Sequence, residues 1–321
     1  MKNPEISVII PTYNYANFIR EALDSVFNQT FQDFEIIVVD DGSTDDTKAI
    51  IESYGDRVIY ISQKNQGPAI ARNTGIMSSR GTYIAFLDAD DLWYPTKLEK
   101  QIALFRKNPK LGMVLADNAL FDDEGIYKNY VGKKAYLFDG DLVTNIFLRS
   151  GVVTPTVMVK REAFDKVGLF EEGLFIAEDD NMWIRIACEF DVDIVDEALA
   201  QIRNHRTRTM SVSTKLVESV ENNIKLLTTK YGPKVASKIA PLAARKYNQL
   251  YFDEGYKHFE NQDYRRARKL FFKATKYRKG HWKAFAYIII TLIPSWLMSA
   301  LRSLKRRLLP SSYNSPKWTR A

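Results

Sequence analysis

A hydrophobic stretch that runs into three carboxylates is the part of this sequence best suited to chemistry. Residues 83–87 (YIAFL) are apolar and favour a buried parallel strand, and Asp88, Asp90 and Asp91 follow them. Asp88 and Asp90 are two residues apart, so in an extended chain their side chains lean to the same side. Two carboxylates at a strand end suit Mg²⁺ or Mn²⁺, which keep several waters and bind substrate phosphates. The alternative is structural, because acidic residues also end strands and cap helices, and Asp91 is expected to cap a helix over 92–95.

Strands and helices alternate through the N-terminal half of the chain, which brings further polar side chains to the same edge. This alternation predicts parallel strands with helical crossovers in a doubly wound sheet. The predicted strands are 6–10, 35–40, 58–62 and 83–87, and the predicted helices begin at Asn17, at Ser43, Thr44 or Asp45, and at Gly67-Pro68. Ligands of such sheets bind at the carboxyl ends of the strands. The polar residues that fall at those ends are Tyr13, Asp40, Asp41, Asp88 and Asp90.

The rest of the chain divides into a less regular middle and a helical C-terminal part. For the middle we expect strands near 113–117, 152–159, 192–196 and 199–203, loop over 122–140, and a helix over 181–189 opened by residues 177–180. From about Lys215 the pattern turns helical, with a helix pair over 251–279 and a turn near 261–263. The predicted division is a sheet domain over 1–213, a helical extension over 214–283, and an apolar segment with a basic tail over 284–321. Cys188, the only cysteine, excludes an intramolecular disulfide and is expected to be a small core residue.

Five short motifs, taken in order along the chain, resemble the family 2 glycosyltransferases of the GT-A fold. They are VIIPTYN at 8–14, VVDDGSTDDT at 38–47, NQG and ARN within 65–73, FLDADD at 86–91 and EDD at 178–180. The resemblance covers roughly residues 4–210 and implies an α/β, Rossmann-like fold with a doubly wound, mostly parallel sheet. It also implies an enzyme that moves a sugar from a nucleotide-diphosphate donor to an acceptor hydroxyl, with inversion at the anomeric carbon.

The resemblance assigns the nucleotide site to the ends of the first two strands. Pro11, Thr12 and Tyr13 would offer an aromatic face on which a base can stack, with backbone N–H groups nearby. Asp41 would accept the imide N–H of uracil or thymine, although residues 40–43 also fit a turn and a helix cap. Because both bases present the same imide edge, UDP and dTDP sugars are the expected donors.

The remaining donor-side residues are charged or strongly polar. Arg72 would point a positive charge towards the donor and Asn73 would orient it, while a solvated helix face is the alternative for Arg72. By the same resemblance, Asp90 would bind the metal that bridges the diphosphate, and Asp88 would contact the ribose or the metal through water. His205 falls where the family often carries an Arg-x-His stretch, so it would touch metal or diphosphate, or else be an ordinary surface histidine.

Inversion requires a base that faces the acceptor hydroxyl from the side opposite the leaving group. Glu178, Asp179 and Asp180 occupy the place at a helix start that the family sets beneath the acceptor. Asp179 is therefore the expected base, Asp180 is the alternative, and Glu178 is a positioning residue. Helix N-termini also attract carboxylates for structural reasons alone.

Charge is distributed unevenly along the chain. The sequence carries 46 Lys and Arg against 39 Asp and Glu, but from Tyr264 onward there are 15 basic residues and no acidic ones. The first 263 residues therefore hold 31 basic residues (46 minus 15) against 39 acidic ones, a net charge of −8. A basic tail on an acidic globular part favours an anionic membrane surface as partner and argues against a nucleic-acid-binding fold.

The apolar segment before the end of the chain extends this expectation. Residues 284–301 carry no charge and precede a basic cluster over 302–307. Eighteen residues is the lower limit for a membrane span, and Pro294 fits a bent or interfacial segment equally well, with a buried core helix as the third alternative. The basic cluster would lie at anionic headgroups on the cytoplasmic side. Since the N-terminus has no signal-sequence pattern, we expect a cytoplasmic protein held peripherally or monotopically at the inner face of the membrane.

The expected activity is sugar transfer, with Mn²⁺ or Mg²⁺, to a hydroxyl of a lipid-linked or surface-glycan acceptor. One rival is a nucleotidyltransferase on a similar sheet, but that class needs a glycine-rich basic loop where this chain has Pro-Thr-Tyr-Asn. A second rival is a non-catalytic sugar-nucleotide-binding or adaptor module built on the helical part. Four clustered carboxylates without a cation would repel one another, which argues against that module.

Overall fold

The computed structural model describes residues 3–174, 176–205, 213–278 and 280–293. The chain forms two compact units, of which the first runs to Ala243 and the second begins at Ala244. The boundary falls within α10 (Gly232–Glu260), so that helix contributes to both units. The division into three parts at residues 213 and 283 remains a prediction.

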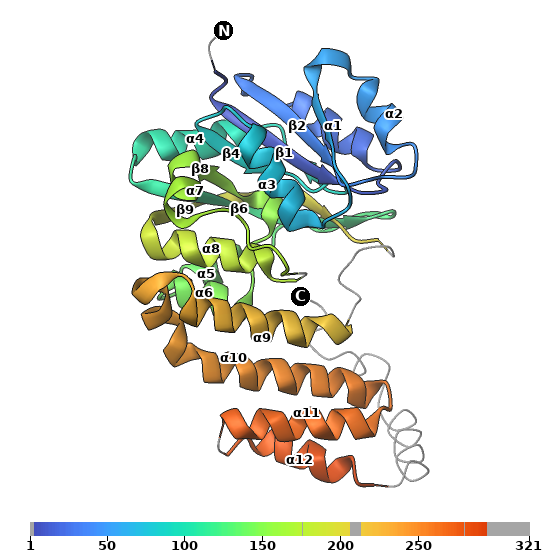
Figure 1. The fold of residues 1–321 in the computed structure, drawn as a ribbon, viewed down its shortest axis with the longest axis vertical. Coiled ribbons are helices and arrows are strands. Elements are labelled where there is room, and N and C mark those ends of the chain that lie inside the picture. Colours follow the sequence, from blue (N-terminus) through green and yellow to red (C-terminus); the bar gives the residue numbers. More distant parts are fainter. Residues whose placement is uncertain (1–2, 175, 206–212, 279, 294–321) are drawn as a thin grey trace. The chain divides into compact units, whose positions relative to one another are not determined.

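One mixed sheet forms the centre of the first unit (Figure 1). Among the residues that the structure describes, nine strands take part, eight in the order β3-β2-β1-β4-β8-β6-β9-β5 and the ninth, β7, beside β6. The strands are β1 (Ile6–Thr12), β2 (Phe34–Asp40), β3 (Ile59–Ser62), β4 (Tyr83–Phe86), β5 (Leu92–Trp93), β6 (Leu111–Asp122), β7 (Gly125–Lys128), β8 (Met158–Lys160) and β9 (Asp191–Arg203). The four N-terminal strands are parallel, which confirms the predicted α/β sheet.

Helices lie against both faces of this sheet. The helices of the first unit that precede α10 are α1 (Ile19–Phe27), α2 (Thr47–Glu52), α3 (Pro68–Ser78), α4 (Lys97–Lys107), α5 (Lys133–Leu137), α6 (Leu142–Arg149), α7 (Arg161–Val167), α8 (Glu178–Glu189) and α9 (Ser213–Thr229). On one face, Val8 of β1 joins an apolar cluster with Leu23 of α1 and Ile102 of α4. On the other face, Gly75 of α3 lies so close to β1 that a β-carbon there would be 2.5 Å from Ile9 Cγ2. Burial on both faces explains the apolar runs at 8–10 in β1, 36–39 in β2 and 84–86 in β4.

The middle of the chain departs from the predicted elements. Residues 122–140 contain β7 and α5 rather than loop alone, and the two strands expected at 192–196 and 199–203 are the single strand β9. The strand expected over 152–159 is a 3₁₀ turn at Thr154–Thr156 followed by β8, which is antiparallel to both β4 and β6. Pro155 at the start of that turn cannot donate to a strand ladder, which explains the break.

Two small predictions concern α1 and α8. The residue that precedes α1 is Phe18 and no side chain caps this helix, so the predicted cap at Asn17 is wrong. Cys188 of α8 is buried, as expected, and burial raises the pKa of its thiol to about 11.

The second unit is helical. It contains the end of α10 with α11 (Tyr264–Tyr277) and α12 (Trp282–Ile290), and the turn after Glu260 confirms the predicted helix pair. Asp263 caps α11 by accepting the N–H of Arg266 at 3.1 Å. None of the helices within the described ranges combines the length and apolar character needed to cross a membrane. Residues 284–293 of the predicted apolar segment are described, and residues 294–301 lie outside the described part of the chain.

Candidate active site

The carboxyl ends of β1 and β2 lie level at one edge of the sheet, as predicted. Pro11 and Thr12, the last residues of β1, pair in register with the last two residues of β2. The buried Asp40 carboxylate accepts hydrogen bonds from the Ser43 N–H and from the Tyr60 hydroxyl, each at 2.8 Å. Asp40 therefore holds the turn that follows β2.

Asp41 organises the loop that precedes α3. Its Oδ1 accepts the Gln63 side-chain amide at 2.7 Å and the Gln66 N–H at 2.9 Å, and its Oδ2 accepts the Gly67 N–H at 2.7 Å. A carboxylate offers about four acceptor positions, so these contacts leave room for about one further donor. Gly67 has a φ of 92°, a conformation that favours glycine at this turn. Asp41 therefore has a local structural role in addition to its predicted contact with a base.

The turn after β1 presents an aromatic ring to solvent. Tyr13 is 44% exposed, whereas Thr12 before it is buried. Asn14 donates its N–H to Ser43 Oγ at 2.9 Å and accepts the Thr44 N–H at 2.7 Å. The turn that carries Tyr13 is thus tied to the turn that follows Asp41, and the Tyr13 ring is available for stacking.

Arg72 joins three elements of the candidate site. The side chain is buried, with Nη2 3.0 Å from Asp88 Oδ1 after β4 and Nη1 2.9 Å from Glu178 Oε1 at the start of α8. Burial alone would lower the pKa of the guanidinium, but Asp88, Glu178 and Asp179 outweigh that effect and raise it. The charge of Arg72 is therefore directed at carboxylates of the protein, and the solvated helix face is wrong.

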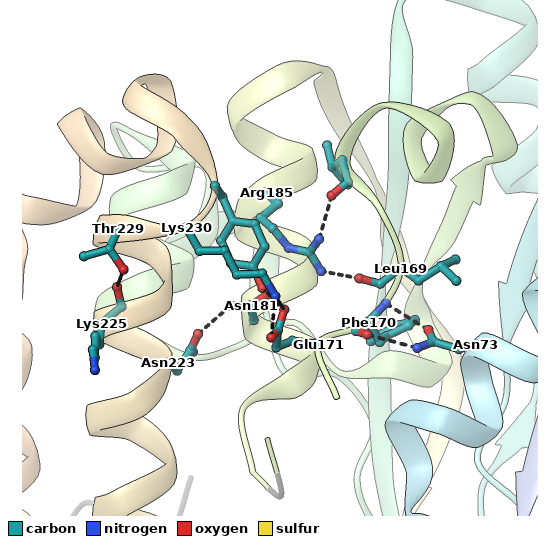
Figure 2. Close-up of polar contacts among 12 residues, drawn as sticks. Asn73, Leu169, Phe170, Glu171, Asn181, Arg185, Asn223, Lys225, Thr229 and Lys230 are labelled. Carbon is teal, nitrogen blue, oxygen red and sulfur yellow. Dashed lines mark hydrogen bonds and ion pairs between the residues drawn. The ribbon is translucent and has the colours of Figure 1, made fainter. Parts of the chain in front are cut away.

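Asn73, the next residue of α3, binds the backbone of a distant segment (Figure 2). Its Nδ2 donates to the Phe170 carbonyl at 3.0 Å, and its Oδ1 accepts the Phe170 N–H at 2.9 Å. Each end of the amide therefore has a partner in the protein, and Asn73 fixes the connection between α7 and α8. Its predicted role towards the donor remains a prediction.

Asp90 and His205 meet at the sheet edge. His205 Nε2 lies 2.8 Å from Asp90 Oδ2, and both side chains are largely buried. The imidazole packs 4.9 Å from the ring of Phe18 between ring centroids. The structure therefore brings together two of the three predicted metal ligands and rejects the alternative of an ordinary surface histidine.

Asp91 differs from its prediction. The residues after it form β5, which pairs with β9, and not a helix that Asp91 could cap. Asp91 is fully buried, and its Oδ1 accepts the Arg203 N–H at 2.8 Å, while Arg203 Nε donates to the Asp90 carbonyl at 2.9 Å. These bonds join the segment after β4 to the end of β9, and so place His205 beside Asp90.

The donor set suits a divalent ion that takes most of its ligands from a substrate. Among the described residues, no group of three or more His, Cys, Asp or Glu side chains is arranged to hold a metal. Asp88 is bonded to Arg72 and does not complete a set with Asp90 and His205. Mg²⁺ and Mn²⁺ are commonly bound through one or two carboxylates together with waters and substrate phosphates. Asp90, with His205 beside it, fits that pattern, and the contact of Asp88 with the ribose or with the metal through water remains a prediction.

Three acidic residues open α8. Glu178 is buried, Asp179 and Asp180 are partly exposed, and the Asp180 N–H donates to Asp179 Oδ1 at 2.7 Å. Burial, together with the charge of Asp179, raises the pKa of Glu178 to about 7. Burial also raises the pKa of Asp179, against the opposing effect of Arg72. Carboxylates with raised pKa values are suited to acid–base catalysis near neutral pH.

The backbone immediately before α8 is strained. Ala177 has φ 68° and ψ 19°, a left-handed conformation that costs a residue with a β-carbon about 1–2 kcal/mol. Such strain persists only where the surrounding structure enforces it, and it is frequent at functional sites. The strained residue directly precedes the acidic turn of α8.

The sequence matches a protein-family model, and this match identifies the class of the chain. The model for glycosyl transferase family 2 matches residues 7–168, a span that contains the β1, β2, α3 and β4 parts of the site. The chain belongs to glycosyl transferase family 2. This glycosyltransferase is 33% identical over 223 residues to an uncharacterized glycosyltransferase of Rickettsia prowazekii, which is 68% of this chain and 70% of that protein. The nucleotidyltransferase and the non-catalytic module are thereby set aside.

Solved structures give the same fold. A fragment of S. aureus TarS in complex with UDP-GlcNAc has a TM-score of 0.61 at 19% identity, with 89% of each chain covered. A mannosyltransferase from Pyrobaculum calidifontis, solved with GDP-Man and Mn²⁺, has a TM-score of 0.62 at 19% identity and covers 95% of this chain and 81% of its own. The glycosyltransferase therefore has the GT-A fold indicated by its motifs.

Sequence reasoning missed the contacts that two arginines, Arg72 and Arg203, make at the site. The ion pairs of Arg72 with Asp88 and Glu178 link residues 16 and 106 positions apart, which no local pattern reveals. Arg203 bonds to Asp91 and to the Asp90 carbonyl, and its place at the end of a predicted strand was a sign in the sequence that it has a partner. A charged residue that ends a predicted core strand is seldom buried unless it is paired.

Proposed function

We propose that this glycosyltransferase moves a sugar, with inversion, from a UDP or dTDP sugar to a hydroxyl of a lipid-linked or surface-glycan acceptor. The observation that carries the proposal is the double ion pair of Arg72, whose guanidinium contacts Asp88 after β4 and Glu178 on α8. One buried side chain thus joins the carboxylates expected on the donor side to those expected on the acceptor side. The residues proposed to bind the donor and those proposed to activate the acceptor would then lie on either side of one arginine.

Donor binding would use the edge formed by β1, β2 and β4. The exposed ring of Tyr13 would stack on the base, and the remaining acceptor position of Asp41 would take the imide N–H. Asp90 with His205 would hold Mn²⁺ or Mg²⁺, and a bound divalent ion would neutralise the charge that builds on the departing diphosphate. The neighbours solved with UDP-GlcNAc and with GDP-Man and Mn²⁺ support a nucleotide-diphosphate sugar and a divalent ion as a class.

Transfer itself would use the first turn of α8. Asp179 would accept the proton of the acceptor hydroxyl while the oxygen forms its bond to the anomeric carbon and the bond from that carbon to the diphosphate breaks. Its raised pKa suits this role near neutral pH. Glu178, held by Arg72, would position Asp179, and Asp180 is the alternative base.

A donor panel tests the proposal. The purified protein is incubated with UDP, dTDP and GDP sugars, with Mn²⁺ or with EDTA, while thermal unfolding and release of the nucleoside diphosphate are followed. We expect a UDP or dTDP sugar to raise the unfolding temperature and to be turned over only when the divalent ion is present. The anomeric configuration of the product, read by NMR, tests inversion. Failure of every nucleotide sugar to stabilise the protein with Mn²⁺ would refute the proposed donor site.

We also infer that the second unit binds the cytoplasmic face of an anionic membrane. Large apolar side chains of this unit are between 48% and 71% exposed at Trp282, Phe285, Ile289 and Leu292. Trp282, Phe285 and Ile289 belong to α12, and their spacing puts them on one face of that helix. Residues 264–293 carry nine basic side chains and no acidic ones. An apolar helix face with basic neighbours is typical of helices that lie in the membrane interface.

A further inference from the structure

A buried carboxamide on α9 contacts the strained turn that opens α8. Asn223 Oδ1 accepts a hydrogen bond from Asn181 Nδ2 at 2.7 Å (Figure 2), and Asn223 Nδ2 donates to the Ala177 carbonyl at 3.4 Å. The same carbonyl accepts the Asn181 N–H at 3.0 Å, so the three residues close a ring of hydrogen bonds. Asn223 is 5% exposed and Asn181 is fully buried. Both ends of the Asn223 amide therefore act on the residue before α8 and on the first turn of α8.

The connection between α7 and α8 is anchored separately near its start. Figure 2 shows Lys230, just after α9, against Glu171, and its Nζ lies 2.7 Å from both carboxylate oxygens of that residue. The Tyr231 hydroxyl also donates to Glu171. Arg185 of α8 donates to the Leu169 carbonyl at 2.7 Å and lies over the Tyr231 ring at 4.5 Å. These contacts hold residues 169–171, and the Asn223 contacts act at the other end of the connection.

We propose that Asn223 is a positioning residue that holds Ala177 in its left-handed conformation and thereby aims the acidic turn of α8 at the reaction centre. Alanine does not favour this conformation, so an interaction from outside the turn must maintain it. Without the Asn223 contact, Ala177 can return to ordinary backbone angles, which rotates the peptide before Glu178. That rotation would move Glu178 and Asp179 away from Arg72. The inference rests on the proposed function in taking this turn to be the catalytic one.

A rescue experiment tests the inference with the full chain. In Asn223→Ala, sugar transfer at saturating donor should fall by about 10- to 100-fold, as expected when a catalytic group is misplaced. The affinity for UDP with Mn²⁺, measured by calorimetry, should stay within about twofold of wild type, because the proposed base and metal contacts at Tyr13, Asp41 and Asp90 follow β1, β2 and β4 and are not on α8. Adding Ala177→Gly to this variant should restore most of the rate, since glycine adopts the left-handed conformation without strain. Ala177→Gly alone should transfer at the wild-type rate.

A matched control separates positioning from stability. Asn248 in the second unit is also 5% exposed, and its Nδ2 donates to the Ala274 carbonyl at 2.8 Å. Asn248→Ala removes the same kind of buried bond and should lower the unfolding temperature while leaving the transfer rate unchanged. If Asn223→Ala does not fold, Asn223→Ser keeps a polar side chain at this buried position but is too short to reach Ala177, and it should show the same loss and the same rescue.

Three results would overturn the proposal. They are a wild-type transfer rate in the Asn223 variants, an equal loss of UDP affinity, and a double variant that gains nothing from Ala177→Gly. Failure of the proposed function is distinguishable, because Asp179→Asn tests the base assignment independently. If Asp179→Asn transfers normally, that assignment fails, and the rescue by Ala177→Gly still decides the role of Asn223.

Discussion

Asp90 and His205 are 115 positions apart in the sequence, yet their side chains lie within hydrogen-bond distance. The pair has one carboxylate and one imidazole, and Arg203 bonds to the Asp90 backbone. Because Arg203 also fixes Asp91, the geometry of the pair is set by the junction of β4 and β9 and not by flexible side chains. A substitution at Asp90 can therefore be interpreted as a change in ligand chemistry.

Asp90→Asn should remove the enhancement of UDP affinity by Mn²⁺ and leave the fold intact. The exchange removes a charge at nearly constant volume, and the ion loses its carboxylate ligand. Calorimetric titration of UDP with and without Mn²⁺ measures the enhancement. Asp123→Asn, on an exposed turn, is the control and should bind as wild type. A wild-type metal effect in Asp90→Asn would remove Asp90 from the metal site.

Asp179→Asn should have a different profile. UDP and metal affinity should persist, while turnover falls by roughly 10²–10⁴-fold, the usual contribution of a general base. Initial rates at saturating donor and acceptor measure the effect. Asp180→Asn is the matched variant one residue along, and a larger loss there would transfer the role of base to Asp180.

The raised pKa of Glu178 predicts how the acidic turn responds to pH. Transfer should increase with pH and level off above about 7, as the buried pair loses its last proton. Stability should change with pH in the opposite direction, because a raised folded-state pKa means that the folded protein binds more protons than the unfolded chain. The free energy of unfolding should therefore fall as pH rises between the ordinary glutamate pKa and about 7. Glu178→Gln should flatten this dependence in urea unfolding at several pH values, and an unchanged slope would contradict it.

At the scale of elements, Arg72 is the link between α3, β4 and α8. Its partners Asp88 and Glu178 belong to elements that approach one another only in the folded sheet. Breaking a buried ion pair leaves an uncompensated charge, whereas an exposed pair contributes little. The stability of the site therefore depends on this arginine more than on the surface ion pairs.

Arg72→Met should lower the free energy of unfolding by about 3–5 kcal/mol, because Glu178 is left buried without its cation. Arg106→Met removes an ion pair with Glu5 in which the arginine is 59% exposed, and it should cost no more than about 1 kcal/mol. Urea unfolding of both variants measures the difference. Equal losses of free energy of unfolding would mean that the buried ion pairs of Arg72 stabilise the protein no more than an exposed pair does.

The parts of the fold with local signals could be predicted from the sequence. The β1–β4 core and the start of α3 at Gly67-Pro68 follow from hydrophobic runs and turn chemistry. The strand β8 could not be predicted in its place, because its antiparallel position between β4 and β6 depends on pairing across the whole domain. For the same reason the motifs named Arg72, Asp88 and Glu178 as site residues but did not show that the arginine pairs with both carboxylates. Asp91 was misassigned because its binding partner, the Arg203 N–H, lies 112 positions away.

At the scale of the whole molecule, the membrane proposal makes a prediction for the second unit. The full chain should co-sediment with vesicles of anionic lipid at low salt, since each basic residue near such a surface contributes about 1 kcal/mol. Truncation before Lys283 should release the protein while donor hydrolysis continues, because every proposed catalytic group precedes that point. Acceptor transfer in membranes should fall.

A point variant sharpens this test. Phe285→Glu places a charge on the exposed face of α12 and should weaken vesicle binding, whereas Ile126→Glu makes the same kind of change on the exposed strand β7 and should not. Full-length protein that stays in the supernatant with anionic vesicles at low salt would refute the membrane proposal.

The burial of Cys188 makes this protein unusually convenient for thiol labelling. It is the only cysteine of the chain, and its raised pKa keeps the thiol protonated and slow to react with maleimides. A cysteine introduced at an exposed position would therefore be the one reactive thiol, without removal of the native one. A solvent-sensitive fluorophore at Phe285→Cys would report whether that face enters lipid, and the same fluorophore at Ile126→Cys would provide the aqueous reference.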